Sequence, residues 1–527
     1  MKKILSLGLL ITLFISCTSV ERFNAHIDRE IPVKRLQKDV DFVYKKLKKN
    51  HPKLDLYLPQ ETIDFKFDSV KKSISKPLKP NEFYKKIQPV VGALRHGHTD
   101  ISPLFKRRTK KEIEQFKNSI GPLSQLSVFW QNDSLFVLKS TNNDPEIKPG
   151  SVILKIDSIA PNELIEKYRT TFFGDGYNAT YFENRLNRNF INYFYTLDKS
   201  VRDSILFTFS YQGEVYNKII KRIYKENKSE EKQEKPETPK VKVPKKSSDQ
   251  QKIKKFEFSY NKSSKSFMRT LSLPTNDSTF AVLKVSTFSY GDFGEDYQKI
   301  FKIINEHKVK NLVLDLRNNG GGRLADSYQL FSYLVPKQSK FLGEQEIVSS
   351  GAFRRAIVDV FPKYVRPFAY PISLISYFIT SKNGENQSYI KPQLSRIKKS
   401  DPQNIYYGNL YVLINGGSYS ASALIASNLK GFNRAYFVGE ETGGDANGSV
   451  AGLMPNYELP NSHLKLSIGT VYLQPNFYHS DVLGQGICPH KEIRTTLNDR
   501  LKNIDPQLNW VIEEVKNGNP ELNKALK

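Results

Sequence analysis

The sequence predicts an α/β protein with a C-terminal core and two smaller N-terminal segments. From residue 255 onward, apolar runs typical of buried strands alternate with amphipathic helical patterns. Residues 33–102 carry a helical periodicity, whereas residues 120–222 alternate apolar and polar positions as strands do. With 527 residues and a 39% hydrophobic composition, the chain can form several domains with sizeable cores.

Residues 1–17 predict an export signal. Met1-Lys2-Lys3 precede ILSLGLLITLFIS, an apolar run that is short for a membrane-spanning helix. The run ends at Phe14-Ile15-Ser16-Cys17, which resembles a bacterial lipobox, in which the cysteine is lipidated and becomes the first mature residue. An ordinary cleaved signal peptide is the alternative. Because Cys488 is the only other cysteine, we expect Cys17 to carry a lipid that anchors the protein in the cell envelope, at the outer membrane or on its periplasmic face.

Residues 18–119 predict a helical segment that ends in a histidine-containing loop. After a short tether, LQKDVDFVYKKL places apolar side chains near one helix face and lysines opposite. A second amphipathic stretch, LKPNEFYKKIQPVVGAL, leads directly into Arg95-His96-Gly97-His98-Thr99-Asp100. The loop therefore follows a helix and offers two histidines for chemistry.

Residues 120–223 predict a small β domain, and residues 224–254 predict a linker. Residues 147–157 resemble the strand-turn of PDZ modules, which capture peptide ends by strand addition; a purely structural β domain is the alternative. The linker is charged, contains proline and has almost no large apolar residues. Such a segment cannot offset its ordering entropy, so we expect it to be mobile.

Residues 255–527 predict the core. The expected strands and helices alternate along the segment, and LKLSIGTVYLQ (464–474) looks like a hairpin. Residues 350–405 interrupt the alternation with PFAYPISLISYFI among basic residues. This stretch could cover a cleft as a lid, touch a membrane surface or extend the core. Covering of the core is the commonest outcome for an aromatic run.

Two glycine-rich strand-to-helix turns carry the strongest signal for chemistry. The strand LYVLIN leads through Gly416-Gly417-Ser418-Tyr419-Ser420 into a helix, and VKNLVLDLR leads through Asn318-Asn319-Gly320-Gly321-Gly322 into another. A serine at such a turn exposes its hydroxyl while backbone N–H groups converge nearby, which suits a nucleophile beside an oxyanion hole. Consecutive glycines let a backbone approach a ligand closely.

LDLRNNGGG, GGSYSASALIASNL and VGEETGG together resemble the C-terminal-processing (tail-specific) serine peptidases and their tricorn-core relatives. The resemblance implies a crotonase/ClpP-like layered core with Ser420, the middle serine of the run, as nucleophile. Ser418 and Ser422 would support it. The implied oxyanion donors are the backbone N–H groups of Gly321, with Gly322 beside it, and of Ala421.

The resemblance also bears on the base. The C-terminal-processing branch uses a lysine, but Asp445 stands at that position here, and Lys430 lies too far along its helix to replace it. The tricorn-core branch takes a histidine from a helix–loop well before the nucleophile, and Gly97-His98-Thr99 resembles that motif. Histidine suits the task because its ordinary pKa of about 6.5 lets it accept and return a proton. We therefore expect His98 as base; an exposed loop histidine is the alternative, and His96 is the neighbour with which it could be confused.

A third group should orient the imidazole. The tricorn-core branch places a carboxylate shortly before a G-x-P-D-like turn, which reads Gly484–His490 here. Asp481 is the nearest preceding carboxylate, and Glu441 and Asp100 are its rivals.

These features predict a serine endopeptidase that cuts unfolded or C-terminal peptide segments through a Ser420 acyl-enzyme. A catalytically inactive peptide- or lipophile-binding lipoprotein on the same fold is the alternative. No cofactor or metal is expected, because the histidines and cysteines lack ligand spacing and no phosphate-binding loop occurs. The net charge of +26 is spread along the whole chain without a nucleic-acid-binding motif, so the expected partners are peptide and membrane.

Overall fold

The computed structural model describes residues 19–141, 144–224, 253–274, 279–335, 340–383, 387–390 and 402–526. The export signal, Cys17 and nearly all of the expected linker 224–254 lie outside the described residues. Within the described residues, no helix combines the length and apolar character needed to cross a bilayer.

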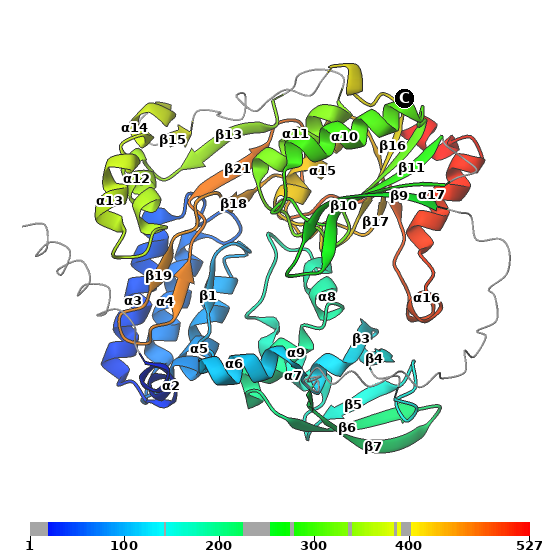
Figure 1. Cartoon of the computed structure of the whole chain (residues 1–527). Helices are drawn as coiled ribbons and strands as arrows, with labels where there is room; N and C mark the ends of the chain where they lie inside the picture. The colour runs from blue at the N-terminus through cyan, green and yellow to red at the C-terminus, as the bar shows by residue number, and fades with distance from the viewer. Residues whose placement is uncertain are drawn as a thin grey trace, which may run out of the picture.

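A seven-stranded mixed sheet forms the centre of the C-terminal core (Figure 1). The strands from β11 to β22 run parallel, and β9 and β10 extend the sheet in antiparallel fashion. In spatial order they are β22 (Lys491–Glu492), β17 (Tyr436–Gly439), β16 (Asn409–Ile414), β12 (Asn311–Asp315), β11 (Phe280–Val285), β10 (Ser266–Pro274) and β9 (Ile253–Asn261).

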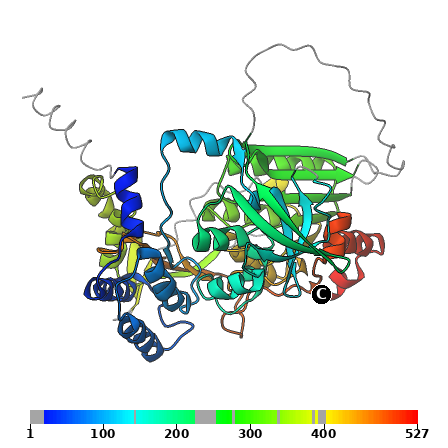
Figure 2. The same cartoon turned by 90° about the horizontal axis from the view of Figure 1, so that it is seen from below.

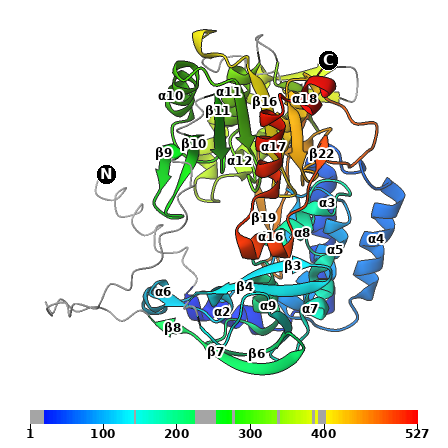
Figure 3. The same ribbon diagram turned by 90° about the vertical axis from the view of Figure 1, so that its right-hand side faces the viewer.

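Helices cover both faces of this sheet. Helices α10 (Phe293–Glu306), α11 (Leu324–Leu334) and α15 (Ala421–Gly431) pack on one face, where Leu312 and Val412 are fully buried. Helices α17 (Pro506–Lys516) and α18 (Pro520–Ala525) pack on the other, and Figure 3 shows α17 lying across the strands. Because both faces are covered, the parallel strands are continuously apolar in sequence.

A second sheet extends the core beyond α15. Its strands are β14 (Thr380–Asn383), β15 (Gln387–Ile390), β13 (Leu342–Ile347), β21 (Val471–Pro475) and β18 (Ser449–Ala451). Between β13 and β14 lie α12 (Ser350–Asp359), α13 (Arg366–Ser373) and α14 (Ser376–Ile379). The hairpin expected over 464–474 is wrong, because β20 (Lys465–Ser467) pairs with β1 and β19 while β21 joins the second sheet. Gly469, in the connection, leaves room for the backbone of Val450.

The N-terminal segment shares a hydrophobic core with part of the C-terminal core. Its helices pack around β1 (Asp100–Ser102), which pairs with β20, and β20 pairs with β19 (Asn456–Glu458) (Figure 1). Leu464, Leu466 and Ile468 are buried in the same cluster as the apolar side chains of these helices. The helices are α2 (Val20–Asp28), α3 (Val33–Asn50), α4 (Gln60–Ser73) and α5 (Pro80–Gly92).

Residues 120–223 form an antiparallel sheet with helices packed on it and a segment that reaches the core. The strands, in order, are β3 (Leu126–Gln131), β4 (Ser134–Ser140), β5 (Val152–Ile156), β6 (Ser204–Tyr211) and β7 (Glu214–Lys221). Helices α7 (Pro161–Arg169) and α9 (Ile191–Lys199) contribute to its hydrophobic core. Between them, the chain leaves the sheet through α8 (Thr180–Leu186), where the Thr180 hydroxyl donates to the Glu441 carbonyl at 3.0 Å. Other short elements are α6 (Lys110–Lys117), the paired strands β2 (Ser119–Ile120) and β8 (Ile223–Tyr224), and α16 (Leu497–Lys502).

The predicted α/β class is confirmed. β1–β20 pairing joins the N-terminal segment to the core, and the α8 segment joins the β domain to the core.

Candidate active site

Ser420 lies at the strand-to-helix turn between β16 and α15. Its backbone adopts φ +58° and ψ −125°, a conformation that a non-glycine residue adopts only at an energetic cost. The residue after it, Ala421, begins α15, and its N–H group belongs to the helix N-terminus that has no intrahelical partner. The turn thus holds a hydroxyl and an unpaired backbone donor at one point.

His98 lies within hydrogen-bond distance of this serine. Its Nε2 is 3.1 Å from Ser420 Oγ, across 322 residues of sequence. The histidine sits in the loop between α5 and β1, and β1 is tied to β20 of the core. The imidazole is mostly buried, with 12% of its side chain exposed.

The other ring nitrogen, Nδ1, faces two hydroxyl groups. Tyr419 Oη is 2.9 Å from it and Ser449 Oγ is 3.0 Å from it. The ring also stacks on the Tyr419 ring, with centroids 4.9 Å apart and an interplanar angle of 19°. If Nε2 accepts the Ser420 proton, Nδ1 carries the ring hydrogen and donates it to one of these hydroxyls.

Asp175 is the carboxylate nearest to the imidazole. Its Oδ1 lies 3.9 Å from His98 Nδ1 and accepts the Gly97 N–H at 2.9 Å. Gly97 lacks a side chain for a steric reason, since a Cβ there would come within 2.3 Å of Tyr419 Oη. The glycine next to the histidine therefore makes room for the tyrosine hydroxyl.

Burial shifts the pKa of both groups. Desolvation lowers the pKa of His98 to about 4, so the imidazole is neutral at neutral pH. Desolvation raises the pKa of Asp175 to about 6, although the Gly97 N–H and the Ser449 and Tyr419 hydroxyls act in the opposite direction. At neutral pH, a neutral base thus lies close to an ionised carboxylate.

The glycine-rich turn lies against Ser420. A Cβ on Gly321 would come within 2.7 Å of Ser420 Cβ and 2.9 Å of the Ala421 nitrogen. The Gly321 N–H, an expected oxyanion donor, instead donates to Asn319 Oδ1 at 2.9 Å. Among the hydrogen bonds of the described residues, the N–H groups of Gly322 and Ala421 donate to no protein acceptor.

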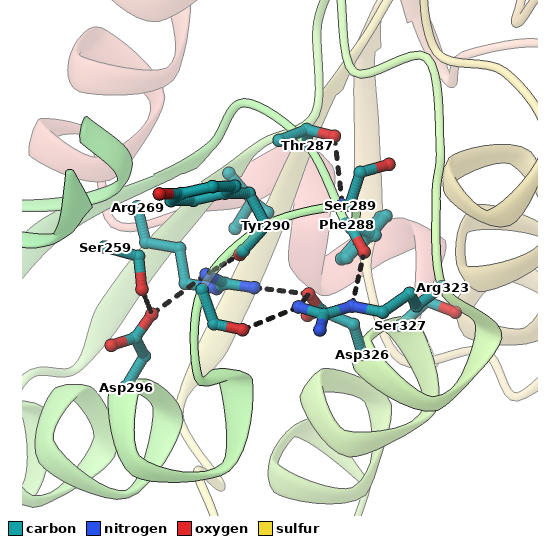
Figure 4. Close-up of polar contacts among 12 residues, drawn as sticks. Ser259, Arg269, Thr287, Phe288, Ser289, Tyr290, Asp296, Arg323, Asp326 and Ser327 are labelled. Atoms are coloured by element: carbon teal, nitrogen blue, oxygen red, sulfur yellow. Dashed lines mark hydrogen bonds and ion pairs between the residues drawn. The ribbon is translucent and has the colours of Figure 1, made fainter. Parts of the chain in front are cut away.

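A buried charge network holds the glycine-rich turn. Arg269 has no exposed surface and lies between Asp296 and Asp326 (Figure 4). It also donates to the Tyr290 carbonyl at 3.0 Å, and Arg323 donates to the Gly291 carbonyl at 2.7 Å.

These contacts shape the loop 286–292, which pairs with the turn. Phe288 N–H donates to the Gly321 carbonyl at 3.0 Å, and Arg323 N–H donates to the Phe288 carbonyl at 2.9 Å. Gly322 lies so close to this loop that a Cβ would meet the Ser289 nitrogen at 2.5 Å. The network therefore supports the backbone beside Ser420 without touching Ser420 itself.

The structure does not bring the expected third residue to the histidine. Asp481 is exposed and makes no hydrogen bond or ion pair with His98 in the described part of the chain. Its rivals are also elsewhere engaged: Glu441 accepts the Gly486 N–H at 2.7 Å, and Asp100 lies 3.4 Å from the Ser102 hydroxyl. Asp481 was expected because it is the carboxylate that most closely precedes the G-x-P-D-like turn. The carboxylate that lies near His98 is Asp175, which belongs to the insert of the β domain.

The positions associated with a lysine base have other partners. Asp445 accepts the Tyr57 hydroxyl at 2.6 Å, and burial raises its pKa to about 6. Lys430 donates to the Cys488 carbonyl at 2.9 Å. Neither makes a hydrogen bond with Ser420 among the described residues.

The other serines of the run are buried. Ser418 Oγ donates to the Leu316 carbonyl at 2.8 Å and accepts the Asn415 N–H, which ties the two glycine-rich turns together. Ser422 Oγ is buried and has no hydrogen-bond partner among the described residues.

Sequence reasoning missed Asp175, Tyr419 and Ser449 as neighbours of His98. Asp175 stands between two glycines in the insert that interrupts the β domain, and Tyr419 stands inside the serine run. Their neighbours in the sequence are glycines and serines, but no local pattern connects either residue with His98.

A serine at a strained strand-to-helix turn, with a histidine nitrogen 3.1 Å from its hydroxyl oxygen, is an arrangement typical of serine-type peptidases. Residues 279–493 match the model of peptidase family S41. This match confirms the resemblance to the C-terminal-processing serine peptidases that was drawn from the sequence.

Solved structures extend the comparison over nearly the whole chain. Mature CPAF is 15% identical, and the match covers 93% of this chain and 98% of that chain with a TM-score of 0.58. CPAF complexed with lactacystin is also 15% identical, with 93% and 99% covered and a TM-score of 0.59. At this identity the likeness concerns the fold, which includes the N-terminal segments as well as the S41 core. No curated protein sequence matches the chain.

Proposed function

We propose that this protein is a serine endopeptidase in which Ser420 is the nucleophile and His98 is the general base. The 3.1 Å contact between Ser420 Oγ and His98 Nε2 carries the proposal, because a hydroxyl needs a base within this range to become nucleophilic. The absence of a lysine at position 445 supports the histidine-based, tricorn-core-like assignment over a serine–lysine dyad.

The chemistry is an acyl transfer. The Ser420 proton moves to His98 Nε2 while Oγ bonds to the substrate carbonyl carbon, giving a tetrahedral oxyanion. His98 then protonates the leaving amine, which departs as the peptide C–N bond breaks. Water then gives a proton to the same imidazole while its oxygen bonds to the acyl carbon. The bond between that carbon and Ser420 Oγ breaks, and His98 Nε2 returns the proton to Oγ.

Two kinds of group stabilise the charges that form. The N–H groups of Ala421 and Gly322 are the oxyanion donors we assign, because Gly321 N–H is engaged by Asn319. Asp175 stabilises the imidazolium through the Tyr419 and Ser449 hydroxyls, which contact Nδ1. This assignment replaces Asp481.

The test is activity on an unfolded protein substrate. Ser420→Ala and His98→Ala should each lower kcat/KM by a factor on the order of 10⁴ or more, and the double variant should be little worse, since the two residues act as a unit. Lys430→Ala is the matched control and should stay close to wild type. Near-normal turnover of a folded His98→Ala protein would contradict the proposal.

A fluorophosphonate probe distinguishes a peptidase from the non-catalytic alternative. Such a probe reacts with an activated serine, so wild-type protein should be labelled at Ser420 and His98→Ala should not. Absence of labelling in the wild type would favour a binding protein on this fold.

We further propose that the substrates are unfolded or C-terminal peptide segments in the bacterial cell envelope. The PDZ-like resemblance of residues 147–157 supports capture of peptide ends by the β domain. The lipobox-like sequence before Cys17 supports anchoring by a lipid on that cysteine. Both statements rest on sequence.

Cys17→Ser tests the anchor. Without a thiol to acylate, the variant should leave the membrane fraction or remain unprocessed with a shifted electrophoretic mobility. Membrane fractionation and mobility identical to wild type would contradict lipidation at Cys17.

A further inference from the structure

The helices between β13 and β14 expose an unusual number of large apolar side chains. We call residues 360–378, which include α13 and the first three residues of α14, the aromatic segment. The exposed fractions reach 76% for Phe368 and 78% for Phe378, and 60% for Ile372. Other exposed members are Val360, Phe361, Tyr364, Tyr370, Leu374, Ile375 and Tyr377.

The burial pattern of the aromatic segment is inverted relative to a soluble helix. Ala369, Ser373 and Ser376 face the protein, with 2%, 0% and 0% of their surface exposed. The phenylalanines, tyrosines and isoleucines between them face outward. A water-facing helix normally buries its large apolar side chains and exposes its small polar ones. The outer surface therefore suits an apolar environment. The expectation that this aromatic run covers the core does not describe its large exposed side chains.

The charges around the aromatic segment are mostly positive. Residues 350–381 contain four basic residues (Arg354, Arg355, Lys363 and Arg366) and a single acidic one, Asp359. Asp359 is paired with Arg366 at 3.0 Å. Arg354 contacts the Tyr377 hydroxyl and lies 5.1 Å from its ring centroid. Basic residues next to exposed aromatic and aliphatic side chains are typical of helices that lie in the interface of an anionic bilayer.

The aromatic segment lies on the same side of the molecule as the start of the described chain, with α3 between them. Figure 1 places α12–α14 at the upper left and α2 at the lower left, and Figure 2, seen from below, places them on the same side; α12 packs against α3, which lies between them. Ser19 caps α2, only two positions after Cys17. A lipid on Cys17 would hold this side of the protein near a membrane.

We propose that the aromatic segment docks onto the surface of an anionic phospholipid bilayer, with Phe368, Ile372 and Phe378 inserted at the headgroup level. Arg355 and Lys363 face the anionic headgroups. This contact goes beyond the proposed peptidase activity and does not depend on it. Together with the lipid on Cys17 it would give two attachments, which fix the orientation of the protein on the membrane as well as its location.

The test is vesicle flotation of a protein that begins at Ser19. This protein lacks Cys17 and its lipid but retains every described helix and strand. The protein should float with vesicles of phosphatidylglycerol mixed with phosphatidylcholine and much less with pure phosphatidylcholine. The pair Phe368→Ser and Phe378→Ser should weaken binding at least tenfold. Arg355→Gln with Lys363→Gln should weaken it mainly on the anionic vesicles and remove its salt dependence.

Matched controls use exposed apolar residues elsewhere. Tyr407→Ser and Ile219→Ser remove side chains that are 67% and 57% exposed but lie outside the aromatic segment, and they should not change flotation. Circular dichroism and probe labelling of Ser420 report that each variant is folded. Phe378→Trp gives a second measurement, because its fluorescence should shift to shorter wavelength when anionic vesicles are added.

Three outcomes would overturn the proposal. The first is no flotation and no fluorescence shift with anionic vesicles. The second is a dimer in solution that dissociates in the Phe368→Ser, Phe378→Ser variant, which would make the surface a contact between copies of the chain. The third is an increased KM for peptide in that variant with unchanged flotation, which would make the surface part of the substrate site. Peptidase activity in solution should be unchanged, so failure here is separable from failure of the proposed function.

Discussion

Two hydroxyl groups lie next to Nδ1 of His98, and no carboxylate makes a direct hydrogen bond with this nitrogen in the described part of the chain. Tyr419 and Ser449 both lie within 3.0 Å of Nδ1, whereas Asp175 Oδ1 is 3.9 Å away. The Tyr419 and Ser449 hydroxyls contact Nδ1 and can also donate hydrogen bonds to Asp175. They therefore link the carboxylate to the imidazole. A buried site of this kind keeps the base neutral but makes its protonated form dependent on Asp175.

The pH profile of kcat/KM should reflect both shifted groups. His98 acts as a base only when it is unprotonated, and burial lowers its pKa to about 4. Asp175 loses its charge as the pH falls through its pKa of about 6. Activity should therefore hold above pH 6 and decline between about pH 6 and pH 4. An acid limb centred at 6.5 or above would contradict this assignment.

Asp175→Asn isolates the carboxylate. The variant should lower kcat by roughly 10²-fold or more, because the imidazolium loses its nearby negative charge. The pH profile of kcat/KM for this variant should also lack the decline near pH 6 that we attribute to protonation of Asp175. Asp481→Asn is the matched control and should leave kcat and the profile unchanged. The reverse result would restore Asp481 as the third residue.

At the scale of elements, the glycine-rich turn depends on a charge network that lies behind it. Arg269, on β10, joins α10 through Asp296 and α11 through Asp326. The same arginine and Arg323 hold the carbonyls of loop 286–292, which pairs with Gly321 and Gly322. The buried guanidinium of Arg269 thus connects β10, α10 and α11, which surround the glycine-rich turn.

Arg269→Met should destabilise the protein and disturb catalysis together. Removing one partner leaves buried carboxylates unpaired, which costs about 3–5 kcal/mol of unfolding free energy. We also expect kcat to fall more than KM rises, because the oxyanion turn loses its support. Urea unfolding and steady-state kinetics measure the two effects.

The control for this prediction is Lys299→Met, which removes an exposed ion pair on α10 with 58% of the lysine side chain exposed. This variant should change the unfolding free energy by no more than about 0.5 kcal/mol and should leave the peptidase activity unchanged. If Arg269→Met behaves like Lys299→Met, the network does not support the turn.

At the scale of the whole molecule, the candidate site is assembled from all three described parts of the chain. His98 comes from the N-terminal helical segment, Asp175 from the insert of the β domain, and Ser420 with Ser449 from the core. β1–β20 pairing, the shared apolar cluster and the contacts of Asn178 and Thr180 with residues 441–443 hold these parts together.

Cleavage of the linker should therefore leave an active, non-covalent complex. The charge and the lack of apolar residues in 224–254 predict that limited trypsin digestion cuts there first. The two fragments should co-elute in size-exclusion chromatography and retain peptidase activity, because the contacts that place His98 do not pass through the linker. Loss of activity with the first cut, or early cleavage within 310–450, would contradict this prediction.

What could be derived from the sequence was local. The α/β class followed from strand and helix periodicity, and Ser420 and the glycine-rich turn followed from short strand–turn–helix motifs. His98 followed from the family resemblance of a three-residue motif. These features depend on residues close together in the chain, so their signals survive in a single sequence.

The remaining parts of the site depended on packing between distant segments. Ser449 lies 351 residues from His98, and Asp175 lies 78 residues from Gly97, whose N–H it accepts. No periodicity or spacing encodes such contacts, because they arise only when separate elements bury their apolar faces against one another. The sequence by itself determined the glycine-rich turn that carries Ser420, the missing lysine and the histidine motif. Only the tertiary structure decided that Asp175, Tyr419 and Ser449 surround the histidine, and that the aromatic segment faces outward.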